Sequence, residues 1–204
     1  MPFETANAGT DDDDLTALVG SRLCHDLISP IGAIGNGVEL LSMTGDTPGP
    51  ELELITQSVA AANARVKFFR VAFGRAGAEQ QLGEAEVAGM LGELSAQSRL
   101  DYEWKVPGDA PRTEVKLAFL AMLCLETALP FGGTLRALPC GDGWMITARS
   151  EKARPNREVF AVLDGAQMEL TPARVQFAML PREAARQGRR LDWSVDTEGG
   201  TIAF

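Results

Sequence analysis

Histidine is the scarcest reactive side chain here: the 204 residues contain one, His25. Cysteine is almost as rare, and Cys24, Cys124 and Cys140 form no close pair. Such spacing fits neither a disulfide framework nor a zinc site, so we expect no metal ion of the chain's own. The sequence also lacks an apolar run near the ~18 residues of a membrane span, and a basic-then-apolar leader. These absences predict a cytoplasmic protein without membrane contact.

Positive charge is also in short supply. The chain has 19 Lys and Arg against 28 Asp and Glu, which leaves a formal net charge of −9. That balance argues against non-specific nucleic-acid binding. Hydrophobic residues, by contrast, make up 45% of the chain, enough for a packed core, and the length suits one or two small domains.

The sole histidine lies within a helical pattern. At about 100° per residue, Leu15, Val19, Leu23, Leu27, Pro30, Ile34 and Leu41 form one apolar stripe, and His25 falls on the opposite side. Imidazole is partly neutral near pH 7 and therefore nucleophilic. A pair with Cys24 is disfavoured because helix neighbours point about 100° apart. The face of His25 carries small side chains that leave room for a large partner: Ser21, Ser29, Gly32 and Asn36.

The N-terminal part reads as a helical hairpin. One helix is predicted over 15–43, a Gly/Pro-rich break over 44–50, and a second helix with a heptad-like repeat over 51–75. A single hairpin cannot cover both apolar stripes. We therefore expect a homodimer that forms a four-helix bundle, with residues 11–77 as its domain.

The second part, residues 84–204 after a linker at 74–83, mixes helices and strands. The expected helices are 84–97, 112–129 and 171–187, the last interrupted at Pro181. The expected strands are 101–106, 134–138, 144–150, 159–163 and a terminal hairpin over 191–204. The fold class that follows is α+β.

The order His25-Asp26-Leu27-x-Ser29-Pro30-Ile31 resembles the H-box of sensor histidine kinases, with Ile28 where those kinases carry a basic residue. The second part resembles their ATP-binding domain, a layered α/β sandwich, most closely at Glu198-Gly199-Gly200. However, Leu123 and Thr127 occupy the positions of the two magnesium-binding asparagines, and Pro181 lies in the region of the phosphate loop. Leucine cannot ligate Mg²⁺. We expect a degenerate ATPase-like domain that binds no nucleotide.

An H-box dimer joined to such a domain resembles the ChpT-type histidine phosphotransferases of alphaproteobacteria. The resemblance implies a phosphorelay in which His25 accepts a phosphoryl group from the receiver domain of a hybrid histidine kinase. His25 would then pass it to a response-regulator receiver. It implies no cofactor of the chain's own, since the partner receiver supplies Mg²⁺.

Two neighbours of His25 have open interpretations. Asp26 could orient the imidazole as a catalytic partner, or be a solvated helix acid. Arg22 could offset the charge of a bound phosphoryl group, or be an ordinary surface arginine. The expected docking face for the receiver is Ser21, Arg22, Ser29, Gly32 and Asn36. Two other functions remain open: an autophosphorylating histidine kinase, and a non-catalytic dimeric adaptor for receiver domains.

Overall fold

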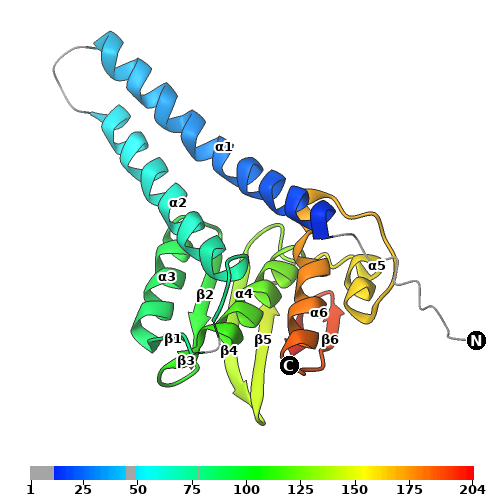
Figure 1. Cartoon of the computed structure of the whole chain (residues 1–204). Coiled ribbons are helices and arrows are strands. Elements are labelled where there is room, and N and C mark those ends of the chain that lie inside the picture. The colour runs from blue at the N-terminus through cyan, green and yellow to red at the C-terminus, as the bar shows by residue number, and fades with distance from the viewer. Residues whose placement is uncertain (1–11, 45–48, 78) are drawn as a thin grey trace, which may run out of the picture.

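The computed structural model describes residues 12–44, 49–77 and 79–204. A long helical hairpin stands on a domain of helices and strands, which confirms the α+β class (Figure 1). Within the described ranges, no helix combines the length and hydropathy that a membrane span requires.

The hairpin consists of α1 (Asp12–Thr44) and α2 (Pro50–Ala72). Pro50 opens α2, where its missing N–H is not needed and its fixed φ suits a first turn. Pro30 lies inside α1 without ending it. The two helices pack along each other as the predicted hairpin.

The second part is built on a five-stranded sheet in the order β2-β4-β5-β7-β6. Only β2 and β4 are parallel; the other neighbours are antiparallel. The helices α3 (Glu84–Ala96), α4 (Arg112–Glu126) and α6 (Gln176–Arg186) cover one face (Figure 1). The strands are β2 (Leu100–Trp104), β4 (Gly133–Cys140), β5 (Gly143–Arg149), β6 (Asp192–Asp196) and β7 (Gly199–Ala203).

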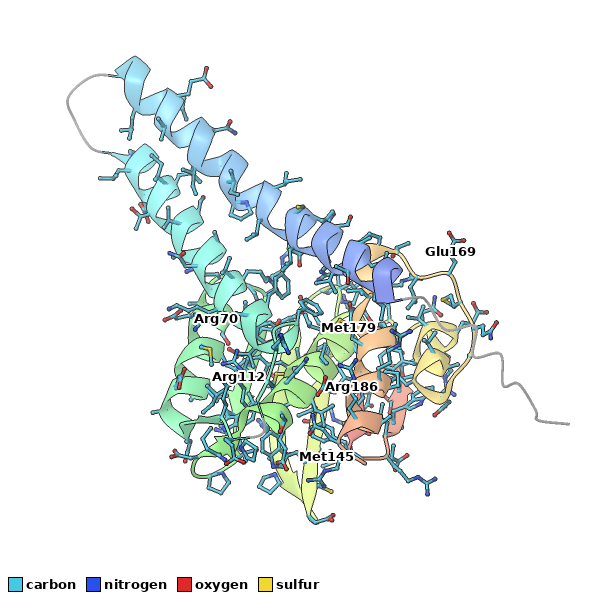
Figure 2. The ribbon with its side chains drawn as sticks, in the orientation of Figure 1. Arg70, Arg112, Met145, Glu169, Met179 and Arg186 are labelled. Atoms are coloured by element: carbon cyan, nitrogen blue, oxygen red, sulfur yellow. The ribbon has the colours of Figure 1, made fainter. Side chains whose placement is uncertain are left out.

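The base of the hairpin is packed into this second part. Phe68 of α2 stacks on Phe119 of α4, with ring centroids 4.4 Å apart and planes at 7°. Arg112, at the start of α4, donates a hydrogen bond of 3.1 Å from an Nη atom to the carbonyl of Arg70 (Figure 2). The core therefore runs from the sheet through α4 into the last turns of α2.

One predicted strand is helical. Residues 159–163 lie in α5 (Arg157–Phe160) and a 3₁₀ turn, η1 (Ala161–Asp164). Asn156 caps the turn, because its Oδ1 accepts from the backbone N–H groups of residues 158 and 159. A short apolar run fits a buried helical turn as well as a strand. Here the cap at Asn156 favours the helical turn.

Three smaller differences concern the start of the last helix, the proline inside it and a short additional strand pair. A short 3₁₀ turn, η2 (Pro172–Arg174), precedes α6, and Pro181 lies inside α6 without interrupting it. The linker and a loop also contribute a two-residue antiparallel pair, β1 (Gln81–Leu82) with β3 (Ala110–Pro111).

Candidate functional site

His25 projects from the middle of α1 into solvent, with 77% of its side chain exposed. The predicted small residues around it are exposed as well: Ser21, Ser29, Gly32 and Asn36. A Cβ added to Gly32 would meet no atom within 4 Å. Ile28 and Ile31 are also exposed. The structure therefore brings the predicted docking residues, except Arg22, onto one open face.

Asp26 lies behind the histidine, with only 13% of its side chain exposed. Its Oδ1 is 3.0 Å from Nδ1 of His25. A carboxylate accepts only, so the proton of a neutral imidazole belongs on Nδ1 in this contact. That tautomer leaves the lone pair on Nε2. The geometry suits the orienting role predicted for Asp26 and not a freely solvated acid.

Arg22 is turned inward, which differs from its expected place on the docking face. Its Nε lies 2.9 Å from Oδ2 of Asp26, and an Nη atom donates to the carbonyl of Ala173 at 2.7 Å. Only 12% of the side chain is exposed. Through these contacts, Arg22 links the carboxylate of Asp26 to η2 of the second part. A direct contact between Arg22 and a docked receiver therefore has little support.

A second arginine, Arg65 of α2, lines the same cavity as Asp26. An Nη atom of Arg65 is 3.6 Å from Oε1 of Glu126, at the end of α4, and 22% of its side chain is exposed. Burial alone would lower the pKa of Arg65, but Glu126, Tyr102 and Asp26 outweigh it and the pKa is raised. Burial raises the pKa of Tyr102. Arg65, Tyr102 and Glu126 are far apart in the chain, so the sequence does not predict that they lie together.

This cavity has a volume of about 410 Å³. Asp26 and Arg65 line it, together with Pro30 and Ser58 of the hairpin and Leu94 of α3. One signal in the sequence could have marked Arg65: the aromatic pair Phe68-Phe69 follows three and four residues later, which places it on the same side of the helix.

Neither of the two positions expected to have lost an asparagine presents a side chain that suits Mg²⁺. Leu123 is 1% exposed, and the hydroxyl of Thr127 donates to the carbonyl of Cys124 at 2.7 Å. Asp164 accepts a hydrogen bond of 3.0 Å from the indole of Trp193. Across the part of the chain that the structure describes, no three His, Cys, Asp or Glu side chains gather to hold a metal ion.

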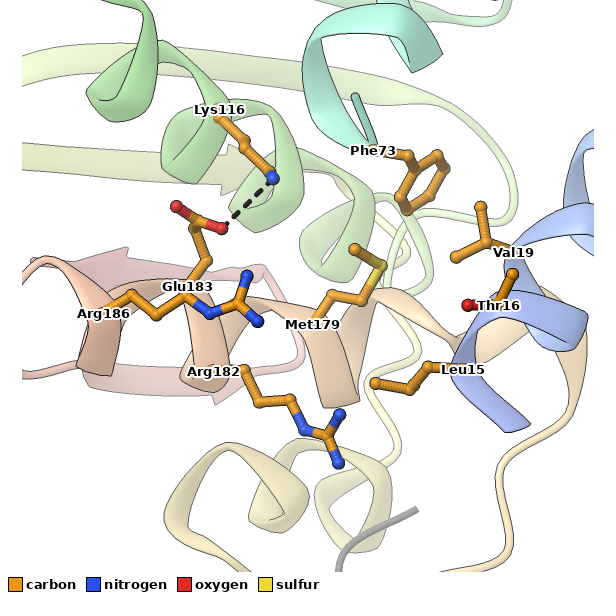
Figure 3. Close-up of a pocket in the computed structure, with 9 residues that line it drawn as sticks. All are labelled: Leu15, Thr16, Val19, Phe73, Lys116, Met179, Arg182, Glu183 and Arg186. Atoms are coloured by element: carbon orange, nitrogen blue, oxygen red, sulfur yellow. Dashed lines mark ion pairs between the residues drawn. The ribbon is translucent and has the colours of Figure 1, made fainter. Parts of the chain in front are cut away.

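A separate cavity of about 390 Å³ lies where α1, α2, α4 and α6 meet (Figure 3). It is lined by Leu15, Phe73 and Arg186 among others, and Lys116 forms an ion pair of 3.1 Å with Glu183 on its wall. None of the predicted site residues lines it.

Three comparisons show which known proteins this chain is similar to. The family model for the histidine phosphotransferase C-terminal domain matches residues 84–199. Protein phosphotransferase ChpT of Brucella abortus (strain 2308) is 39% identical over 124 residues, which are 60% of this chain and 59% of that protein. The match thus spans less than two thirds of that relative.

A solved structure described as a bacterial phosphotransferase superposes with a TM-score of 0.79, at 29% identity over 95% of this chain and 96% of that one. The histidine kinase AdeS of Acinetobacter baumannii is more distant, with a TM-score of 0.46 and 9% identity over 88% and 95% of the two chains.

Proposed function

Because this chain belongs to the histidine phosphotransferase family, whose C-terminal domain model covers residues 84–199, we propose that His25 carries a phosphoryl group between receiver domains. The donor is the aspartyl phosphate of a receiver on a hybrid histidine kinase. The acceptor is the aspartate of a response-regulator receiver. The supporting observation is an exposed imidazole whose Nδ1 meets the shielded carboxylate of Asp26, which leaves Nε2 free.

In the first transfer the Nε2 lone pair attacks the phosphorus of the aspartyl phosphate. The N–P bond forms, the P–O bond breaks, and the receiver's aspartate leaves as a carboxylate. Nδ1 keeps its proton, so the ring becomes positively charged. Asp26, 3.0 Å away, stabilises that charge as it develops. The second transfer is the same sequence in reverse, onto the next receiver's aspartate.

Phosphoryl transfer depends on in-line positioning and charge stabilisation more than on covalent help. The receiver would supply Mg²⁺ and the reacting carboxylate, and this chain would supply a nucleophile that a folded domain can reach. Ser21, Ser29, Gly32 and Asn36 leave the space for such a domain. We propose no cofactor of the chain's own, and its cytoplasmic location stays a prediction.

The test is incubation with a receiver domain carrying a labelled aspartyl phosphate. The wild-type chain should acquire acid-labile label, and His25→Ala should acquire none. Because the side chain is exposed, the substitution opens no core cavity and should change the free energy of unfolding by less than about 0.5 kcal/mol. Label on a folded His25→Ala protein would show that the site assignment is wrong. A wild-type chain that binds receivers without taking label would favour the adaptor.

We also propose a homodimer through the hairpin. Apolar side chains stay exposed at seven-residue intervals on both helices: Cys24, Ile31 and Val38 on α1, and Leu52, Val59 and Val66 on α2. Seven-residue spacing is the repeat of helices that pack as a bundle, and a second hairpin would cover both rows.

Sedimentation at micromolar concentration should show a dimer. Val59→Glu should shift it toward monomer, because a carboxylate would enter an apolar seam. A wild-type chain that sediments only as monomer would remove the basis for the bundle.

A nucleotide-independent reaction is part of the proposal. Leu123 is buried and Thr127 bonds to its own helix, so neither position offers an exposed amide to Mg²⁺. An autophosphorylating kinase would need such ligands, which is why the phosphotransferase is the function we favour.

A further inference from the structure

The contact between His25 and Asp26 joins adjacent residues of one helix, and such neighbours do not normally face each other. The ring nitrogens of an exposed imidazole can also form hydrogen bonds with water. If the contact is to select one tautomer, something outside those two residues must hold the carboxylate in place. The question is which groups do so.

Arg22 is the first restraint. It lies one turn before Asp26, and an ion pair between two such positions on an isolated helix is weak. Here the far end of the guanidinium is also fixed, at 2.7 Å from the carbonyl of Ala173. The arginine thus links Asp26 to η2, and the whole contact is shielded from water.

Arg65 is the second restraint. A carboxylate shut away from water requires nearby cations to remain charged. Arg65 lines the same cavity as Asp26, and it is held from behind by Glu126 at the end of α4. A carboxylate without this cation would be free to turn away from Nδ1, and the proton of the imidazole would then distribute over Nδ1 and Nε2. The nucleophilic lone pair would no longer always face the partner.

We propose that Arg22 and Arg65 are positioning residues for the phosphotransfer, acting on His25 through Asp26. Their anchors, the Ala173 carbonyl and Glu126, both belong to the second part of the chain. The second part of the chain thus has a role in the reaction: it fixes the tautomer of a histidine on the hairpin. This inference rests on the proposed function.

The tautomer can be measured directly because His25 is the only histidine. In a chain labelled with ¹⁵N-histidine, long-range ¹H–¹⁵N correlations at about pH 8.5, above the usual histidine range, report a single neutral ring. The wild type should show a proton on Nδ1. Arg22→Met and Arg65→Met should each shift the ring toward a mixture of tautomers, and Arg65→Lys should restore Nδ1–H.

Arg136→Met is the matched control. It removes an arginine that is paired with Glu103 by hydrogen bonds of 2.8 and 3.1 Å, but between strands β4 and β2. The control should leave the imidazole spectrum unchanged. A spectrum that stays the same in folded Arg22→Met and Arg65→Met proteins would overturn the proposal. If Arg65→Met fails to fold, Glu126→Gln tests the same restraint from its anchor, since it should also loosen Arg65.

A double-mutant cycle on the labelling rate separates positioning from direct contact. Each methionine variant should label about 10- to 100-fold more slowly than wild type, the range seen when groups that orient a reactive ligand are removed. In an Asp26→Ala background the same substitutions should change the rate by no more than about twofold, because residues that act as a unit are not additive.

Equal losses in both backgrounds would mean that the arginines act on the phosphoryl group or on the receiver, which contradicts the proposal. The relay and the restraint can also fail separately. If the wild type takes no label, the relay is wrong, while the tautomer spectra still decide whether the two arginines hold the ring.

Discussion

α1 and α4 are helices of one molecule with opposite relations to water. α1 projects His25 into solvent and surrounds it with small side chains. α4 is buried over every residue of 115–125, and Phe119 and Leu123 lie in the middle of the core. A helix that is buried all round mainly packs the core, whereas a helix with one open face can meet a partner. The comparison shows that the exposed histidine lies on the helix with an open face, and that residues 115–125 of α4 offer no such face.

Asp26→Ala gives the largest effect in this comparison, because it removes the group that makes the open face of α1 reactive. The rate of labelling by a phospho-receiver should fall about 10²–10⁴-fold, the usual contribution of a positioning or acid–base group, which corresponds to roughly 3–5 kcal/mol of activation free energy. Asp26 orients the ring without carrying the phosphoryl group, so transfer should slow and not stop. An unchanged labelling rate would show that Asp26 has no role in the transfer.

Leu123→Asn tests the buried helix. The substitution restores an amide where kinases have one, yet α4 offers that amide no water. We expect a loss of about 2–3 kcal/mol in the free energy of unfolding, measured with urea, because the amide is buried without a hydrogen-bond partner. Leu123→Met, which keeps the volume, should cost less than about 1.5 kcal/mol.

Calorimetry with ATP and Mg²⁺ completes that test. Neither the wild type nor Leu123→Asn should bind with a dissociation constant below about 0.1 mM, which corresponds to roughly 5.5 kcal/mol of binding free energy. Tighter binding by the wild type would contradict the proposed nucleotide-independent reaction.

Gly32→Trp is the smallest expected change and probes the open face alone. A tryptophan there meets no atom of this chain within 4 Å of its Cβ, so the fold should stay intact, while the bulk should block a docking domain. Receiver affinity should fall at least tenfold, or about 1.4 kcal/mol. Gly89→Trp on α3 is the matched control, because a Cβ there is equally unobstructed. Equal affinities of the two variants would place the receiver elsewhere.

The sequence was informative wherever the cause of a feature is local. The hairpin follows from two periodic stripes and a Gly/Pro break, and the exposure of His25 follows from its angle to the apolar stripe. The terminal pair of strands follows from alternation around Glu198-Gly199-Gly200. The predicted strand over 159–163 is wrong because five consecutive apolar residues show no periodicity. The feature that favours the helical turn is a single side chain, the cap at Asn156.

The surroundings of Asp26 could not be predicted, because they depend on tertiary packing. Arg22 reads as a surface residue until η2 brings the carbonyl of Ala173 to it. Arg65 reads as a helix cation until α4 places Glu126 beside it. Ala173 is far from Arg22 in the chain, and Glu126 is far from Arg65, so no local sequence pattern predicts these contacts.

The stacking of Phe68 on Phe119 has a consequence for how the molecule opens. Ala64, Phe68 and Ala72 are buried in the same core as α4, whereas Leu52 and Val59 near the start of α2 are exposed. Local unfolding follows such differences in buried contacts. In a chain without a partner hairpin, the last turns of α2 should therefore be lost cooperatively with the sheet domain, while its first turns fray on their own. In terms of folding, the boundary between hairpin and domain then lies inside a helix and not in the linker that follows it.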